Sequence, residues 1–183
     1  MKATGIVRRI DDLGRVVIPK EIRRTMRIRE GDPLEIFTSS AGEVVFKKYS
    51  PVGEIGEFAA QYAESLYKTC GMSVIIGDRE SVIACAGLPK KDFLKKGFSK
   101  EFEDIIENRA LYVADGKSDI SATDSDEDGY SVTCAMPIIS EGDIAGCVAA
   151  VISKDMESQN GDTEMNGKLV QTAASFLGRM LEQ

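Results

Sequence analysis

The segment GRVVIPKEIRR, residues 14–24, decides how this chain is organised. A glycine opens a β-branched apolar run, a proline ends that run, and three arginines lie within eleven residues. β-Branched residues favour a strand. Pro19 suits the first position of a helix, because its missing N–H would be unpaired there in any case. The segment therefore predicts a strand followed by a helix that displays basic side chains.

The flanking residues extend this pattern into a small unit over residues 1–50. We expect, in order, a strand, a turn with Gly14 available for positive φ, the strand and helix just described, a second turn, and a β-hairpin. The ranges outside the central segment are 5–10, 11–14, 30–33, 34–38 and 43–48. Fifty residues of this kind bury too little apolar surface to be stable alone. A second copy of the unit is expected to complete its core.

Charge is divided unequally along the chain. Residues 1–50 hold eleven Lys/Arg and seven Asp/Glu, whereas residues 51–183 hold 12 and 23. A basic region on an acidic protein indicates contact with a polyanion, of which double-stranded DNA is the main candidate. The expected DNA-binding residues are Arg8, Arg15, Arg23 and Arg24. Three further basic residues are expected near the DNA, namely Lys2, Arg9 and Lys20.

Residues 2–8, 13–19 and 21–24 resemble the AbrB-type transition-state regulators. The resemblance implies a swapped-hairpin (AbrB/MazE-like) dimer, in which strands of two chains interleave into a small β-barrel whose DNA-binding face carries the four arginines. Over its whole length the chain resembles one sporulation regulator of that family. This implies that it activates and represses sporulation genes. Because a strand-based reader has few base-contacting groups, we expect tolerant rather than strict site choice.

A boundary is expected at residues 51–53, where Pro51 and Gly53 separate the basic unit from a different pattern. Residues 54–183 predict helices around an antiparallel, meandering sheet, so the whole chain is expected to be α+β. The expected helices cover residues 54–69, 99–108 and 162–182, and the expected strands cover residues 72–77, 81–86, 111–114, 131–139 and 144–152. The apolar stripe of the last helix is predicted as Met165, Leu169, Thr172, Ala173, Phe176, Leu177 and Met180.

The element order and the phrases AMPI (residues 135–138) and IAGC (residues 144–147) of this second part resemble a GAF domain. The resemblance implies either a sensor of an unidentified small ligand or a plain oligomerisation unit. With the homodimer formed by residues 1–50, oligomerisation through residues 54–183 would build a homotetramer. Two alternatives remain: an antitoxin-like protein-interaction module, and a small-molecule sensor that meets DNA only incidentally. Antitoxins usually carry a disordered tail, whereas residues 54–183 have the composition of a folded domain.

Other functions are disfavoured by what the sequence lacks. It has no histidine and no nucleotide-binding or hydrolase motif, so no enzyme activity, cofactor or metal is expected. The acidic run 124–128 is predicted to be a solvated loop rather than a calcium site. The four cysteines are widely spaced and are predicted to be buried, reduced thiols: Cys70, Cys85, Cys134 and Cys147. No segment resembles a signal peptide or membrane span, so the expected location is the cytoplasm, on the nucleoid.

Overall fold

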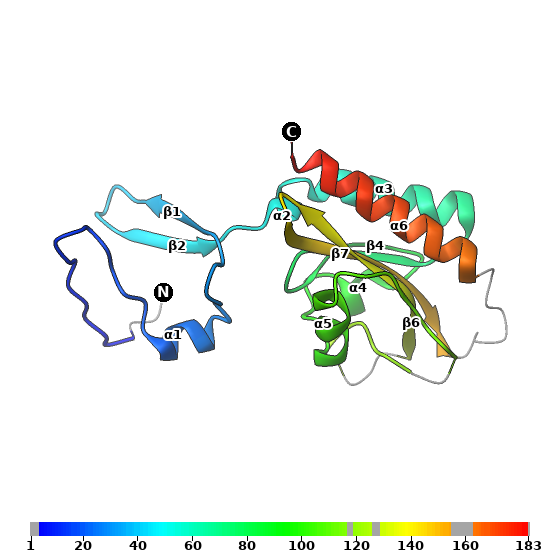
Figure 1. Ribbon diagram of the computed structural model, residues 1–183, viewed down its shortest axis with the longest axis horizontal. Coiled ribbons are helices and arrows are strands. Elements are labelled where there is room, and N and C mark those ends of the chain that lie inside the picture. The colour runs from blue at the N-terminus through cyan, green and yellow to red at the C-terminus, as the bar shows by residue number, and fades with distance from the viewer. Residues whose placement is uncertain (1–3, 117–118, 126–128, 155–162, 183) are drawn as a thin grey trace. The chain divides into compact units, whose positions relative to one another are not determined.

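The computed structural model describes residues 4–116, 119–125, 129–154 and 163–182. The chain divides into two compact units, residues 1–49 (unit 1) and 50–183 (unit 2) (Figure 1). Each unit has its own helices and its own antiparallel sheet.

The described residues of unit 1 form one short helix and one β-hairpin. Helix α1 (Lys20–Thr25) follows Pro19, and β1 (Leu34–Thr38) pairs antiparallel with β2 (Val44–Lys48). The hairpin turn is closed by a hydrogen bond from the Ser39 N–H to the Glu43 carbonyl at 3.0 Å. The helix, the hairpin and the turn at residues 11–14 are as the sequence predicts.

The two strands predicted at residues 5–10 and 15–18 are not formed. The turn between them is present, with the Asp11 N–H bonded to the Arg15 carbonyl and the Gly14 N–H to the Asp11 carbonyl, each at 3.1 Å. Gly14 has a positive φ, a conformation that glycine adopts without steric cost. The flanking segments form no strand because no other part of the described chain offers them a ladder of backbone hydrogen bonds. The prediction is wrong for a single chain.

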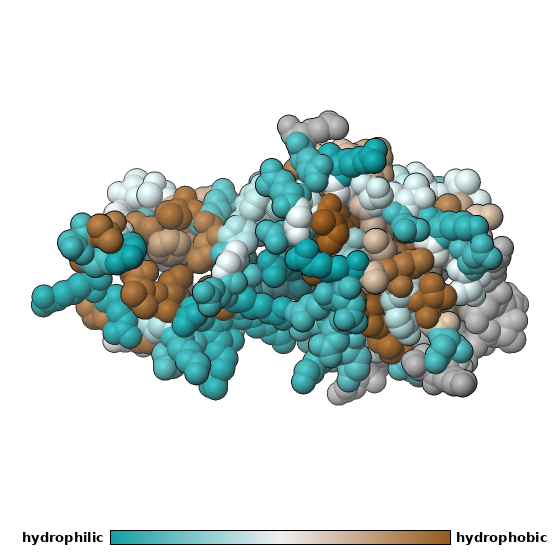
Figure 2. Space-filling model, in the orientation of Figure 1, coloured by the Kyte–Doolittle hydropathy of each residue, from teal (hydrophilic) through white to brown (hydrophobic). Residues whose placement is uncertain are grey.

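Unit 1 leaves its apolar side chains on the surface. Pro19 is the one buried residue among those that the structure describes in this unit. Val7, Ile10 and Val17 are 85%, 69% and 70% exposed. Figure 2 shows apolar side chains gathered on the surface of unit 1. An exposed apolar patch of this kind marks a surface that another molecule covers.

Unit 2 is a five-stranded antiparallel sheet between two groups of helices, so the predicted α+β architecture is confirmed. Its elements are α2 (Pro51–Glu54), α3 (Gly56–Cys70), β3 (Val74–Gly77), β4 (Val82–Ala86), α4 (Lys90–Phe93), α5 (Lys100–Glu107), β5 (Tyr112–Val113), β6 (Tyr130–Ser140), β7 (Asp143–Ser153) and α6 (Thr163–Met180). The strand order is β4-β3-β7-β6-β5, which is not the simple meander that the sequence suggests. Strand β7 lies between β3 and β6 because its middle residues are apolar and buried on both faces.

The helices cover opposite faces of the sheet. Helices α3 and α6 pack over one face, where Leu66, Val148 and Leu177 belong to one buried cluster. Helices α4 and α5 cover the other face, where Phe93 and Phe102 belong to a second cluster (Figure 1). Helix α4 has no counterpart in the sequence prediction, because four residues are too few for a helical period to be recognised.

Helix α6 approaches the sheet through its small residues. A Cβ added at Gly178 would lie 2.3 Å from the Ile139 carbonyl oxygen, so only glycine fits there. The predicted stripe of large residues is therefore partly wrong, since Met165 and Phe176 are 53% and 43% exposed. The residues that α6 does bury are Gly167, Val170, Ala173, Ala174, Leu177 and Gly178.

Three of the four cysteines are buried as predicted, and burial raises the pKa values of the Cys85 and Cys134 thiols. Cys70 is exposed, contrary to the prediction, because it ends α3 just before the left-handed Gly71. No helix among the described residues is long and apolar enough to cross a membrane. The acidic run at residues 124–128 lies partly outside the described residues, which omit 126–128.

Candidate nucleic-acid interface

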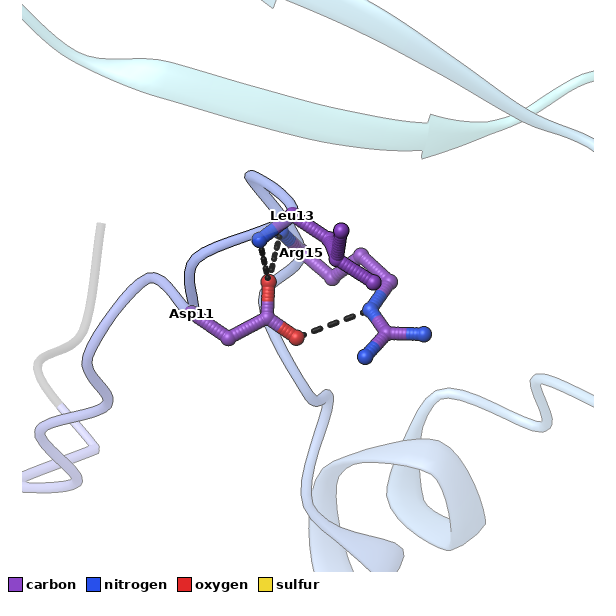
Figure 3. Close-up of polar contacts among 3 residues, drawn as sticks. All are labelled: Asp11, Leu13 and Arg15. Atoms are coloured by element: carbon purple, nitrogen blue, oxygen red, sulfur yellow. Dashed lines mark hydrogen bonds and ion pairs between the residues drawn. The ribbon is translucent and has the colours of Figure 1, made fainter.

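One carboxylate fixes the turn that precedes the arginine-rich helix (Figure 3). Asp11 Oδ1 accepts hydrogen bonds from the backbone N–H groups of Leu13 and Arg15 at 3.0 and 2.7 Å. Asp11 Oδ2 accepts a hydrogen bond from Arg15 Nε at 2.8 Å. The same side chain thus closes the turn and positions the Arg15 guanidinium.

The electrostatics of this turn follow from its hydrogen bonds. The backbone N–H of Arg15 and then its guanidinium hold the pKa of Asp11 below its usual value, because both stabilise the ionised carboxylate. The Arg15 side chain nevertheless remains 69% exposed. Asp11 uses only Nε, so the two terminal nitrogens of the guanidinium keep donors for an external anion (Figure 3).

Arg23 and Arg24 lie in the last turn of α1 and are both exposed. The helix is fixed at each end by backbone hydrogen bonds, from the Arg23 N–H to the Pro19 carbonyl at 2.9 Å and from the Ile28 N–H to the Arg23 carbonyl at 2.7 Å. Ile22, next to Arg23, is half-buried. The helix therefore turns its apolar residue inward and leaves the two arginines accessible to a ligand.

The remaining predicted residues lie on separate segments. Arg8 and Arg9 precede the turn, Lys20 opens α1, and all three are exposed. Lys2 lies outside the described residues. Within one chain the four candidate arginines come from three places: the segment before the turn, the residue after the turn, and the helix end. The structure places Arg23 and Arg24 together on α1. Arg8 and Arg15 belong to the same unit but lie on separate segments.

The candidate residues are largely without acidic partners. Of the candidate basic residues that the structure describes, only Arg15 forms an ion pair, and its partner is Asp11. Lys48 has a structural role instead, since its ammonium group donates to the Arg27 carbonyl and lies 4.0 Å from Asp32 Oδ2. Exposed cations without internal partners are suited to neutralising phosphates.

Asp11 is a site residue that sequence reasoning assigned only to a turn. Its signal in the sequence was the spacing of four residues between an acid and an arginine, Asp11 and Arg15, across a turn that contains glycine. This spacing alone does not reveal that one carboxylate bonds both the backbone and the guanidinium.

Unit 2 presents an aromatic cluster that sequence reasoning also missed. Phe58 and Tyr62 of α3 pack against Phe176 of α6, with ring centroids 5.9 and 5.7 Å from the Phe176 centroid. Sequence reasoning placed Phe176 on the apolar stripe of the last helix, but Phe176 is 43% exposed. The cluster therefore lies at the outer side of the α3–α6 pair rather than in the core.

Comparison with protein families gives one match for each part of the chain. Residues 54–182 match the family described as "Stage V sporulation protein T C-terminal, transcription factor". Residues 7–53 match the family described as "Antidote-toxin recognition MazE, bacterial antitoxin".

Comparison with individual proteins gives similarity over the whole chain. The chain is 53% identical over 184 residues to stage V sporulation protein T of Bacillus subtilis (strain 168), with 100% of both chains covered. It is 57% identical over 51 residues to transition state regulatory protein AbrB of the same organism, which covers 28% of this chain and 52% of that protein.

Among solved structures, the GAF domain of A. aeolicus nlh2 in an inactive state is similar, with a TM-score of 0.50 and 17% identity. The similarity covers 69% of this chain and 83% of that one. It bears on the fold alone, and it supports a GAF-like fold for unit 2. Together with the sequence similarity of unit 1 to AbrB, it confirms the predicted pairing of an AbrB-like part with a GAF-like part.

Proposed function

We propose a DNA-binding function for this chain on the premise that it belongs to the stage V sporulation protein T family of transcription factors. Unit 1 binds double-stranded DNA through Arg8, Arg15, Arg23 and Arg24. Unit 2 assembles the chains into a tetramer. The protein acts on the nucleoid in the cytoplasm, where it activates some sporulation genes and represses others.

The observation that carries the proposal is that the basic side chains of unit 1 are exposed and mostly without ion-pair partners. Arg8, Arg23 and Arg24 are exposed, and no acidic side chain of the described residues forms an ion pair with them. Arg15 is anchored by Asp11 yet remains largely exposed. Each such cation that meets a phosphate releases counterions, which supplies affinity that falls steeply with salt.

The exposed apolar residues of unit 1 support a swapped-hairpin dimer. Val7, Ile10 and Val17 lie in the segments predicted as strands, which find no strand partner within the described chain. Pairing those segments with a second chain would complete the ladders and bury the apolar side chains together. A two-fold dimer would also present the arginines in two symmetric sets, which suits two half-sites on one duplex.

Site choice is proposed to be tolerant. Four arginines per chain, spread over three segments, place most contacts on the backbone, where no base identity is read. Discrimination then rests on a few base edges and on how easily the duplex deforms. Single base-pair changes in a bound site should each cost well below the roughly 3 kcal/mol at the upper end for strict readers. Losses of that size at many positions would contradict tolerant choice.

The aromatic cluster supports assembly through unit 2. Phe176 is partly exposed and packs against two half-buried rings of α3. Aromatic residues are enriched at protein–protein interfaces. Packing this face against its equivalent in another chain would join two unit 1 dimers into a tetramer. A Phe176→Ala variant should then sediment as a dimer, and a persisting tetramer would place the interface elsewhere.

A small ligand of unit 2 is proposed for the open groove between β6 and α6. The groove is lined by Met136, Pro137, Ile139, Gln171, Thr172, Ala174, Ser175, Phe176 and Arg179. This mixture suits a compound with an apolar body and a carboxylate, because Arg179 has no ion-pair partner among the described residues. Thermal-shift screening of aliphatic and aromatic carboxylates, with Arg179→Gln as the control, tests this. Equal shifts in both proteins would refute the assignment.

DNA binding itself is tested by comparing the full chain with two single variants. Arg23→Ala should bind DNA about 30-fold more weakly at 0.15 M salt and stay tetrameric, since Arg23 is exposed and makes no ion pair among the described residues. Arg109→Ala removes one exposed arginine from unit 2, outside the proposed groove, and should bind DNA like the parent. A monomeric or unfolded Arg23→Ala protein would mean that this arginine holds the dimer. Normal DNA binding by Arg23→Ala would mean that the proposed face is wrong.

The match of residues 7–53 to an antitoxin family favours a second candidate function, an antitoxin-like interaction module. Such a module usually carries a disordered partner-binding tail, whereas the residues after 53 form a sheet with two buried clusters. Limited proteolysis distinguishes the two functions. A stable fragment that begins near residue 50 supports the regulator, and degradation of everything after unit 1 supports the antitoxin-like module.

A further inference from the structure

A short segment of unit 2 reverses the charge of the acidic domain around it. Residues 87–100 contain five lysines and one aspartate, a net charge of +4. The rest of residues 51–183 contains seven basic and 22 acidic residues, a net charge of −15. The five side chains are called the lysine surface: Lys90, Lys91, Lys95, Lys96 and Lys100.

The lysine surface is held on a rigid support. The Lys95 N–H donates to the Val82 carbonyl at 2.8 Å, and the Val82 N–H donates to the Lys96 carbonyl at 3.0 Å. Phe93 and Phe98, in the same segment, are buried and pack into the core. The lysines therefore project from a segment that is bonded to β4 and anchored in the core. Such pre-organisation lowers the entropic cost of binding.

Lys95 occupies an unusual backbone conformation. Its φ is positive, in the left-handed region where residues other than glycine are uncommon. A lysine occupies this position, although a glycine, Gly97, lies only two residues further along the chain. Lys95 directly follows Leu94, the C-cap of α4, where a left-handed residue commonly ends a helix. This conformation turns the chain back toward β4 and fixes the backbone from which Lys95 projects.

The chemistry of the lysine surface favours a polyanion over a protein. Four of the five lysines are exposed, and Lys96 is half-exposed. Among the described residues none of the five forms an ion pair, and residues 87–100 contain no exposed large apolar side chain. Protein interfaces are depleted of lysine and enriched in aromatic residues, whereas phosphates bind lysines as point charges.

We propose that the lysine surface binds the phosphate backbone of the same duplex that unit 1 holds. This rests on the proposed function, and it adds a second contact made by a different unit. Contacts that are weak one by one then add affinity without reading sequence.

The test is the salt dependence of DNA binding by the full chain, measured by fluorescence anisotropy on a labelled duplex long enough to extend beyond unit 1. Lys91→Gln/Lys95→Gln removes two lysines of the surface. Lys154→Gln/Lys168→Gln is the matched control, because it lowers the net charge equally but removes lysines that are paired with Asp119 and Glu164. Light scattering on each DNA-free protein reports the oligomeric state.

The surface variant should lose about 5-fold in affinity per lost contact at 0.15 M salt, and the slope of log K against log salt should become shallower by about 0.9 per contact. The control should keep the parent's slope. Equal slopes in both variants, with the parent binding DNA, would overturn the inference and leave the proposed function standing. Dissociation of the DNA-free surface variant would also overturn it, because the lysines would then hold another copy of the chain. Failure of the parent itself to bind DNA would refute the proposed function.

Discussion

Ile10 provides the sharpest test of the dimer in unit 1. Its side chain is 69% exposed in the single chain, although it lies in a segment predicted as a strand. Ile10→Ala removes three carbons, worth roughly 2.4 kcal/mol when fully buried, at about 0.8 kcal/mol per carbon. About 1.7 kcal/mol of this, the 69% that the chain itself leaves exposed, would come from the partner. Two copies per dimer double the loss to roughly 3.3 kcal/mol.

That loss corresponds to a rise of a few hundred-fold in the concentration at which the unit 1 dimer dissociates. In the proposed tetramer, the full chain should then separate into dimers held through unit 2. Sedimentation equilibrium or mass photometry over a dilution series measures the midpoint. Leu111→Ala removes the same three carbons from a partly exposed residue of unit 2 and should leave the midpoint unchanged. An unchanged midpoint for Ile10→Ala would refute the swapped-hairpin dimer.

The Asp11 turn and the contact of α6 with the sheet provide three further tests. Arg15→Ala should cost about 30-fold in DNA affinity at 0.15 M salt, from one lost contact in each of two chains. Asp11→Ala leaves Arg15 charged but no longer positioned, so it should lower DNA affinity less than Arg15→Ala does in the same anisotropy titrations. Equal losses of affinity in the two variants would show that the charge of Arg15 contributes nothing beyond its contact with Asp11. The folded pKa of Asp11 is lowered, so its contribution is present above the usual value of 3.8 and lost only as pH falls through the lower folded pKa. The affinity ratio of parent to Asp11→Asn should therefore stay constant between about pH 5 and 8, and a ratio that falls with decreasing pH in that window would contradict the assignment. Gly178→Ala should lower the free energy of unfolding of unit 2 by about 2 kcal/mol, because the added methyl group overpacks the helix–sheet contact. Gly167→Ala, whose Cβ would lie 3.6 Å from Leu111 Cδ2, should be neutral or stabilising in the same thermal unfolding, and equal effects would show that the helix simply shifts.

Much of the fold could be predicted because most elements carry a local signal. The α1 helix follows from Pro19 and the basic residues after it, and the hairpin at 34–48 follows from its two apolar runs. The strands at 5–10 and 15–18 could not be judged from one chain, since the described residues offer these segments no hydrogen-bond partners. The β-branched residues of these segments predicted strands, and the small size of residues 1–50 predicted that the unit lacks a core of its own. The single chain confirms that the core is lacking, but its two segments form no ladder of strand hydrogen bonds.

The α6 stripe could not be predicted because close packing depends on the facing backbone. Met165 and Phe176 have the apolarity of core residues, yet Gly178 and Ala174 are among those that α6 buries. Nothing in helical periodicity favours glycine as a contact residue. Only the position of the Ile139 carbonyl shows why a larger residue is excluded.

The candidate site divides in a similar way. Clustered arginines are visible in the sequence because charge needs no fold to be counted. The role of Asp11 in holding Arg15 depends on the turn geometry, and this requires coordinates. The net negative charge of unit 2 masks the lysines of residues 87–100 when charges are counted along the sequence. The structure shows that this segment is hydrogen-bonded to β4, which holds the lysines in place.

The measurement that tests the account most directly is the salt dependence of DNA binding by the full chain and by Arg23→Ala. Four arginines in each of two chains predict a slope of log K against log salt of about −7, before any contribution from lysines. Arg23→Ala should bind far more weakly, with a slope shallower by about 1.8, while remaining tetrameric. A slope near zero for the parent, or a parent-like affinity and slope for Arg23→Ala, would contradict the claim that these arginines hold DNA.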